Sequence, residues 1–262
     1  PEKAPVISQD FTGQIEFDRV AFRFNAKREP ALRQLSFKIE PGEFIAVCGP
    51  SGAGKTTMVK TLMGLYQPQS GLVRVDGINL RQVNMGAWRQ NTGTALEVAD
   101  FYHGSIAQNI RLACPEASDA DIEAIAQRFG LDAYYGDALP ERLATRMSHQ
   151  NLLAWPDALP SRISLCRAFI KKSAIRILDN PADTLDFSGE AALKAELERG
   201  RGLSTIIMTT HRPSLMRLAD KVLWVEDGMV AGFDTPDEIV PKFLTTYTSN
   251  NAGQAAQAGS KA

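Results

Sequence analysis

Cysteines are few in this sequence, and long hydrophobic runs are absent. The three cysteines, Cys48, Cys114 and Cys166, lie far apart among 262 residues and lack the spacing of metal ligands. A sparse, odd-numbered set indicates buried free thiols in a reducing compartment. No uninterrupted apolar run approaches the roughly 18 residues that a membrane-spanning helix needs. A signal peptide is not recognisable either.

The sequence also lacks an excess of charge of either sign. Its formal net charge is −1 and its isoelectric point is about 6.4. Because there is no basic excess, we do not expect nucleic acid or an anionic membrane surface as a partner. With 44% hydrophobic and 23% charged residues, the composition is that of an ordinary globular protein. The length suits one large domain, or a core with a subdomain.

The hydrophobic pattern predicts an α/β fold with an inserted helical part. Phe44–Cys48 is apolar throughout, as in a strand that is buried on both faces of a parallel sheet. Helical patterns dominate from about 105 to 172. Residues 1–12 are predicted to be a linker, and the Gly-, Ala-, Gln- and Ser-rich segment 246–262 a disordered tail. Further strands are predicted at 175–178, 205–209 and 222–226.

A glycine-rich loop follows the first of these buried strands. Gly49-x4-Gly54-Lys55-Thr56 has the spacing of a P-loop. Its glycines let consecutive backbone N–H groups face phosphate oxygens, and the next helix offers its free N–H groups to the same anion. Lys55 is expected to reach the β- and γ-phosphates, and the Thr56 hydroxyl to bind Mg²⁺. The predicted ATP–Mg²⁺ contacts are Gly49, Ser51, Gly52, Ala53, Gly54, Lys55, Thr56 and Thr57.

Several short motifs accompany this loop in a fixed order. They are Val73-Arg74-Val75-Asp76-Gly77, Gly104-Ser105-Ile106-Ala107-Gln108-Asn109-Ile110, Ile175–Asp179, Thr184-Leu185-Asp186 and Thr210-His211-Arg212-Pro213-Ser214-Leu215. Together they resemble the nucleotide-binding domain of ABC transporters, in the exporter branch whose membrane domain precedes the ATPase. The resemblance covers about residues 13–245.

The resemblance implies a fold and two partners. The fold is that of a P-loop NTPase: a RecA-like α/β core, an antiparallel β-subdomain and an inserted helical subdomain at about 105–172. The partners are an exporter's transmembrane domain, upstream in the same chain or a separate subunit, and a second nucleotide-binding domain in a homo- or heterodimer. The location is the cytoplasmic face of the inner or plasma membrane. His211–Leu215 and Gly232–Glu238 look most like peptide exporters and type I secretion ATPases.

The resemblance also gives roles to individual residues. Asp179, at the end of a hydrophobic strand, matches the acid that holds Mg²⁺ together with Thr56. His211 matches the switch histidine that contacts the γ-phosphate. Phe24 matches the aromatic ring that stacks on adenine, although an ordinary core phenylalanine is the alternative. Glu97 replaces the Q-loop glutamine, and its carboxylate could still bind Mg²⁺.

Two departures from the family pattern concern catalysis directly. The family glutamate that polarises the attacking water is Asn180 here, and an amide cannot accept a proton near neutral pH. The family signature Leu-Ser-Gly-Gly-Gln is replaced by Trp155–Leu159. Pro156 lacks both a hydroxyl and an N–H, and Asp157 puts a negative charge where a phosphate should lie. We therefore expect intact ATP binding with slow hydrolysis.

Two alternatives stay open at this point. An active ATPase could use Glu97 or Asp183 in place of the missing glutamate. A non-transport interaction module could keep the fold with a vestigial or regulatory ATP site. The residues proposed to act in catalysis are accordingly His211, Asn180 and Glu97.

Overall fold

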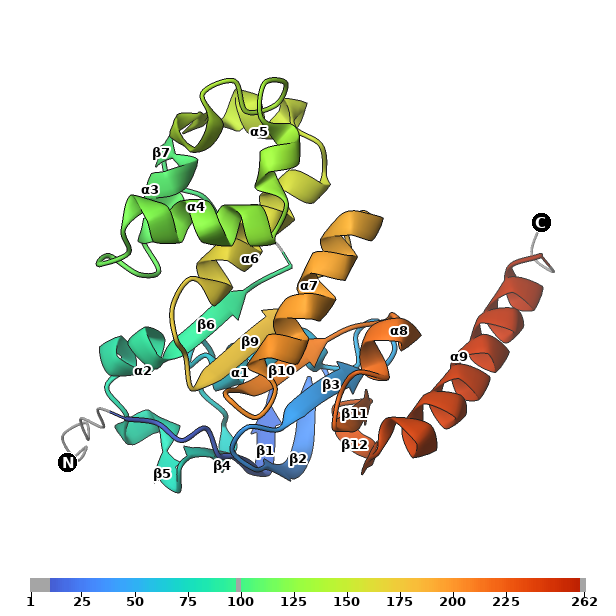
Figure 1. The fold of residues 1–262 in the computed structure, drawn as a ribbon. Helices are drawn as coiled ribbons and strands as arrows, with labels where there is room; N and C mark the ends of the chain where they lie inside the picture. The colour runs from blue at the N-terminus through green and yellow to red at the C-terminus, as the bar shows by residue number, and fades with distance from the viewer. Residues whose placement is uncertain (1–9, 98–99, 260–262) are drawn as a thin grey trace.

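The structure is a computed structural model that describes residues 10–97 and 100–259. Its centre is a six-stranded sheet in the order β12-β11-β3-β10-β9-β6 (Figure 1). All neighbouring strands are parallel except β11 and β12, which form an antiparallel hairpin at one edge. The strands are β3 (Phe44–Cys48), β6 (Thr92–Ala95), β9 (Ile175–Asp179), β10 (Thr205–Thr209), β11 (Lys221–Glu226) and β12 (Met229–Asp234).

The central strands β3, β9 and β10 are buried at every residue. Such strands are apolar on both faces because other elements cover both faces of a parallel sheet. Parallel pairing also brings their carboxyl ends to one edge, where Thr209 pairs with Asp179 on one side and with Val47 on the other. The residues that follow these strands, Gly49, Asn180 and Thr210, are therefore close in space. Ligands of open α/β sheets bind at this kind of edge.

A second, antiparallel sheet has the order β2-β1-β4-β5. Its strands are β1 (Ile15–Phe22), β2 (Leu32–Ile39), β4 (Ser70–Val75) and β5 (Ile78–Asn79). Buried and more exposed residues alternate along much of β1 and β2, so one face of this sheet joins a hydrophobic core. Phe17 and Phe37 stack there with ring centroids 4.6 Å apart. This sheet confirms the predicted antiparallel β-region, and the whole is the expected mixed α/β fold.

The helices of the inserted part lie together in space. Helices α3, α4, α5 and α6 gather at one end of the molecule, and the antiparallel sheet lies at the other (Figure 1). The helices are α1 (Lys55–Leu62), α2 (Met85–Asn91), α3 (Ile106–Arg111), α4 (Asp119–Arg128), α5 (His149–Ala154), α6 (Ala158–Phe169), α7 (Phe187–Gly200), α8 (Pro213–Met216) and α9 (Pro236–Gly259). The minor elements are η1 (Leu80–Gln82), η2 (Leu131–Tyr134), η3 (Arg142–Ala144), β7 (Gly104–Ser105) and β8 (Arg146–Met147). Among the described residues, none of the helices is long and apolar enough to span a bilayer.

The N-terminal boundary differs from the expected linker at residues 1–12. Phe11 is buried and packs edge-on against Trp88, with ring centroids 5.5 Å apart. The hydroxyl of Thr12 donates a hydrogen bond of 2.6 Å to the Asp76 carboxylate. Residues 11 and 12 are therefore fixed to the domain. The rest of the predicted linker, residues 1–9, lies outside the described part of the chain.

The C-terminal boundary also differs from expectation. Helix α9 continues to Gly259, across most of the predicted disordered tail at 246–262. Alanine and glutamine are good helix formers, so a polar, low-complexity composition does not by itself prevent a helix. The start of α9 is anchored by the buried side chains of Ile239, Val240 and Phe243.

Candidate functional site

The P-loop is held in shape by two glycines that no other residue could replace without strain. Gly49 has φ +149°, and a Cβ atom there would lie 2.0 Å from the Val225 carbonyl oxygen. Gly54 has φ +104°, and its Cβ would lie 2.4 Å from the Ala31 carbonyl oxygen. Gly54 is also the N-cap of α1 and offers no side chain to the first N–H groups of that helix. These N–H groups can therefore face an anion.

Lys55 is the cation inside this loop. Its Nζ donates hydrogen bonds of 2.8 Å to the carbonyl oxygens of Gly49 and of Pro50. Its side chain is buried, and burial holds the pKa of the ammonium below its ordinary value. The nearby carboxyl groups of Asp179 and Glu97 act in the opposite direction. The structure thus gathers the predicted lysine and carboxylates around one loop.

Asp179 lies at the buried carboxyl end of β9. The Thr209 hydroxyl donates a hydrogen bond of 2.6 Å to its Oδ1. Burial raises the pKa of Asp179, while hydrogen bonds from Thr209 and Thr56 lower it. The Asp179 carboxylate and the Thr56 hydroxyl are the oxygen donors that Mg²⁺ prefers. Within the described residues, no cluster of three or more His, Cys, Asp and Glu side chains could hold a metal, so Mg²⁺ here would need phosphate and water ligands as well.

Glu97 and Asn180 meet in the structure although 83 positions separate them in the sequence. The Asn180 Nδ2 donates a hydrogen bond of 3.4 Å to the Glu97 Oε2. Asp183 lines the same pocket of about 250 Å³. Asn180 has φ +45°, a left-handed conformation that asparagine tolerates better than glutamate does. An amide and a carboxylate therefore face each other across this pocket.

His211 follows β10 and lies close enough to Lys55, Asp183 and Glu97 to interact with their charges. Partial burial, and then the positive charge of Lys55, hold the pKa of His211 below its ordinary value. The carboxyl groups of Asp183 and Glu97 partly offset this effect. The imidazole is therefore neutral near pH 7 and is available as a hydrogen-bond donor or acceptor.

Phe24 lies in an aromatic cluster and is not a core residue. Its side chain is 50% exposed. It meets Phe22 and Tyr66 edge-on, with ring centroids 5.0 and 5.6 Å away. Phe22 and Tyr66 stack on one another at 5.0 Å. A half-exposed ring held by two others favours the adenine-stacking hypothesis over the core alternative. Sequence reasoning missed the support from Tyr66, which comes from beyond the end of α1.

The segment Trp155–Leu159 connects α5 to α6 and includes the first two residues of α6. Trp155 and Leu159 are buried in the core, whereas Pro156 and Asp157 are exposed. Asp157 directly precedes α6, and its carboxylate forms no capping hydrogen bond with that helix. The start of α6 therefore presents an exposed carboxylate.

Asp186 and its neighbour Phe187 begin α7. The Asp186 carboxylate accepts a hydrogen bond of 2.8 Å from the Gly189 N–H and forms an ion pair with the buried guanidinium of Arg162. Phe187 is 91% exposed. Pattern analysis gives no signal for Phe187, because exposure of an aromatic ring depends on the tertiary structure.

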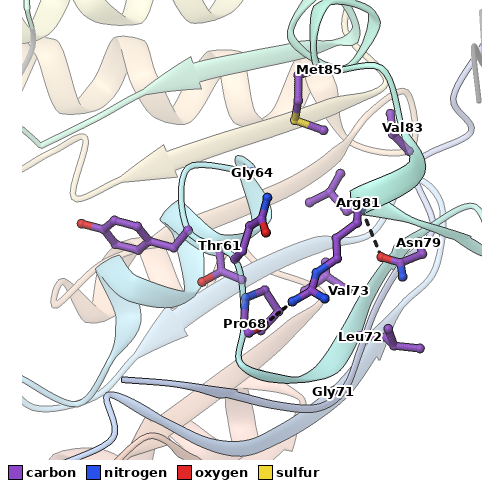
Figure 2. Close-up of a pocket in the computed structure, with 13 residues that line it drawn as sticks. Thr61, Gly64, Pro68, Gly71, Leu72, Val73, Asn79, Arg81, Val83 and Met85 are labelled. Carbon is purple, nitrogen blue, oxygen red and sulfur yellow. Dashed lines mark hydrogen bonds between the residues drawn. The ribbon is translucent and has the colours of Figure 1, made fainter. Parts of the chain in front are cut away.

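A further pocket, of about 100 Å³, lies between the end of α1 and the segment from β4 to α2 (Figure 2). Arg81 extends across it toward the carbonyl oxygen of Pro68 (Figure 2). Thr61, Gly64 and Met85 are among its lining residues. None of the predicted site residues line it, so this pocket is separate from the P-loop site.

Comparison with known proteins places these features in context. The family model for ABC transporters matches residues 32–183. The chain is 32% identical over 241 residues to the beta-(1→2)glucan export ATP-binding/permease protein NdvA of Bradyrhizobium diazoefficiens, a match covering 88% of this chain and 38% of that protein. It is 34% identical over 219 residues to the ATP-binding cassette sub-family B member 6 of Homo sapiens, covering 83% of this chain and 26% of that protein. The chain therefore spans well under half the length of these relatives.

A solved structure shares the fold. It is described as a bacterial Atm1-family ABC exporter with ATP bound. It superposes on this chain with a TM-score of 0.86, covering 95% of this chain and 44% of that chain at 23% sequence identity.

Proposed function

Because the chain belongs to the ABC transporter family, we propose that it is the ATP-binding domain of an exporter, which binds ATP–Mg²⁺ tightly and hydrolyses it slowly. The observation that carries this proposal is the contrast within one site. The side chains of Lys55, Thr56 and Asp179 lie close together, which supports binding of phosphate and Mg²⁺. At the next position Asn180 replaces the group that would accept a proton from water.

Binding follows from what each group offers. The P-loop N–H groups and the Lys55 ammonium bind the phosphates, and Thr56 and Asp179 would hold Mg²⁺. When bound, Mg²⁺ neutralises charge on the phosphate oxygens. The Phe24 ring stacks on the adenine, and neutral His211 can hydrogen-bond the γ-phosphate. Asn180 can still orient a water molecule by hydrogen bonding, but it cannot take the proton from it.

A groove between α2 and the ends of α1, α3 and α6 is the proposed contact with the membrane domain. It has a volume of about 440 Å³. Leu65, after α1, and Leu112, after α3, line it and are 50% and 54% exposed. Thr94 of β6 lines it too, and Glu97 lies just beyond the end of that strand, so β6 links this groove to the nucleotide site. The relatives named as export ATP-binding/permease proteins support such a partner, at the cytoplasmic face of the membrane.

The second proposed partner is another nucleotide-binding domain, in a homo- or heterodimer. Phe187 supports this because a ring that is 91% exposed beside Asp186 would gain from burial in an interface. Asp157 would then face a nucleotide held by the partner and repel its phosphates. Both sites of such a pair would be impaired. The narrower class of peptide exporter or type I secretion ATPase rests only on His211–Leu215 and Gly232–Glu238 and remains a prediction.

A second candidate function is an active ATPase in which Glu97 replaces the missing glutamate. The hydrogen bond from Asn180 to Glu97 favours it, because it places a carboxylate beside the position of the lost one. Asp183 lines the same pocket and is the other candidate base.

The test of the proposed function is ATP binding measured beside ATP turnover on the same preparation. Calorimetric titration with ATP–Mg²⁺ should show binding, and a steady-state phosphate-release assay should show little turnover, with or without a partner domain. Binding accompanied by turnover at ordinary exporter rates would favour the second candidate. Absence of ATP binding would refute both and leave the interaction-module alternative.

The role of Phe24 in binding the adenine base can be tested by substitution. We expect Phe24→Ala to weaken ATP binding roughly tenfold, because base–aromatic stacking contributes about 1–3 kcal/mol. Tripolyphosphate, which has no base, should bind both proteins equally in the same calorimetric titration. Phe24→Tyr keeps the ring and should bind ATP normally. Equal loss of ATP and tripolyphosphate binding in Phe24→Ala would show damage to the phosphate loop instead.

A further inference from the structure

A basic pocket lies at the amino ends of β9 and β10, at the opposite edge of the sheet from the P-loop. Its volume is about 500 Å³. Four cationic side chains and one carboxylate line it, so positive charge is in excess by three. These charged side chains are Arg128, Lys172, Arg176, Arg199 and Glu196.

Arg176 is the unusual member of this set. It lies on β9 between Ile175 and Ile177, where every residue is buried, and it is only 9% exposed. Its guanidinium lies 4.9 Å from the centre of the Phe169 ring and donates hydrogen bonds to the Ser204 hydroxyl and to a backbone carbonyl. Throughout the described residues, no ion pair links Arg176 to a carboxylate and its Nε atom has no hydrogen-bond partner. A buried cation without a counter-charge is costly.

The one carboxylate of the pocket is already engaged. Glu196 is 2% exposed and accepts a hydrogen bond of 2.8 Å from the Arg128 Nε. It also forms an ion pair with Arg199. Two cations therefore share Glu196, which leaves the charges of Arg176 and Lys172 unbalanced. Burial, and then the nearby charge of Arg128, lower the pKa of Arg176, in line with a missing counter-charge.

Helix ends explain part of this charge but not all of it. Arg128 and Arg199 lie in the last turns of α4 and α7, where positive side chains interact favourably with the helix dipole. Arg176 lies on a strand, so this explanation does not apply to it. A second buried polar atom beside the pocket, the Ser173 hydroxyl, also lacks a partner in the described structure.

We propose that this pocket binds a small phosphorylated anion, with Arg176 and Lys172 as its main cationic contacts. The site is distinct from the nucleotide site, because Arg176 and Asp179 lie toward opposite ends of the same strand. Lys172 is exposed at the mouth of the pocket, where it can meet an incoming anion. The proposal does not depend on ATP binding at the P-loop.

The test uses pyrophosphate as the probe and the whole chain in a Lys55→Ala background, which removes the main phosphate contact of the P-loop. Calorimetric titration at low salt should show one site. Arg176→Leu should weaken it roughly tenfold or more, because charge-assisted hydrogen bonds are the strong ones. Leucine is the substitution of choice because the neighbours of Arg176 on β9 are isoleucines. Circular dichroism checks that the variant is folded.

A second pair of variants keeps the test decisive if Arg176→Leu does not fold. Lys172→Glu reverses the charge of an exposed side chain and should abolish pyrophosphate binding. Arg217→Ala removes an exposed positive charge outside the pocket and should leave binding unchanged. Binding that is absent from the parent chain, or unaffected by both Arg176→Leu and Lys172→Glu, would overturn the proposal. An equal loss in Arg217→Ala would also overturn it, because general electrostatics would then explain the result.

Discussion

Replacing Lys55 with alanine is expected to weaken ATP binding at least one hundredfold. The ammonium is buried, and its Nζ donates to the Gly49 and Pro50 carbonyl oxygens at 2.8 Å, at the place where the phosphates would lie. Removing one partner of a buried charge pair costs about 3–5 kcal/mol, which corresponds to a factor of roughly 10² to 4 × 10³ in the dissociation constant. Calorimetric titration with ATP–Mg²⁺ measures the effect directly.

The control for this experiment is a lysine far from the nucleotide. Lys242 on α9 is exposed and forms an ion pair with Glu238, so Lys242→Ala should bind ATP normally. Thermal unfolding separates loss of binding from loss of fold. The Gly228 N–H donates a hydrogen bond of 3.0 Å to the Ala53 carbonyl oxygen, which holds the loop independently of the Lys55 side chain. An unchanged dissociation constant in a folded Lys55→Ala protein would contradict the assignment of this loop as the ATP site.

The features that sequence analysis predicted well depend on local pattern. The run Phe44–Cys48 is apolar because both faces of its strand are covered, and the strand is buried throughout. The glycine spacing of the P-loop reflects backbone conformations and close approaches that the structure confirms at Gly49 and Gly54. Local chemistry alone thus located the loop, the strand before it and the helix after it.

The features that it could not predict depend on long-range packing. Glu97 and Asn180 meet only because β6 and β9 are neighbours in the sheet, and nothing local to either residue reveals that contact. The exposure of Phe187 has the same origin. Arg176 indicates a binding site only once the structure shows that its side chain is buried, with an Nε atom that has no hydrogen-bond partner. At the C-terminus, the polar composition predicted a disordered tail, whereas α9 continues to Gly259.

Slow ATP turnover is the second large effect that we expect. Loss of a general base reduces rates by about 10² to 10⁴. Asn180→Glu should restore little of this, for two reasons. The residue has φ +45°, a backbone conformation that is more strained for glutamate than for asparagine. The segment that includes Pro156 and Asp157 would still fail to bind the partner's nucleotide. Steady-state phosphate release with saturating ATP–Mg²⁺ measures the rate.

Glu97→Gln distinguishes the two candidate functions. If Glu97 acts as the base, this variant loses whatever turnover the parent chain has and still binds ATP. If the domain mainly holds ATP, turnover is low in both proteins and Glu97→Gln changes neither rate nor binding. Asp183→Asn is the matched comparison, because the Asp183 carboxylate lines the same pocket. Unlike Glu97, it does not accept the hydrogen bond from the Asn180 side chain. Loss of turnover in Asp183→Asn alone would move the base to Asp183. A hundredfold rise in rate on Asn180→Glu would instead show that the missing glutamate was the only defect.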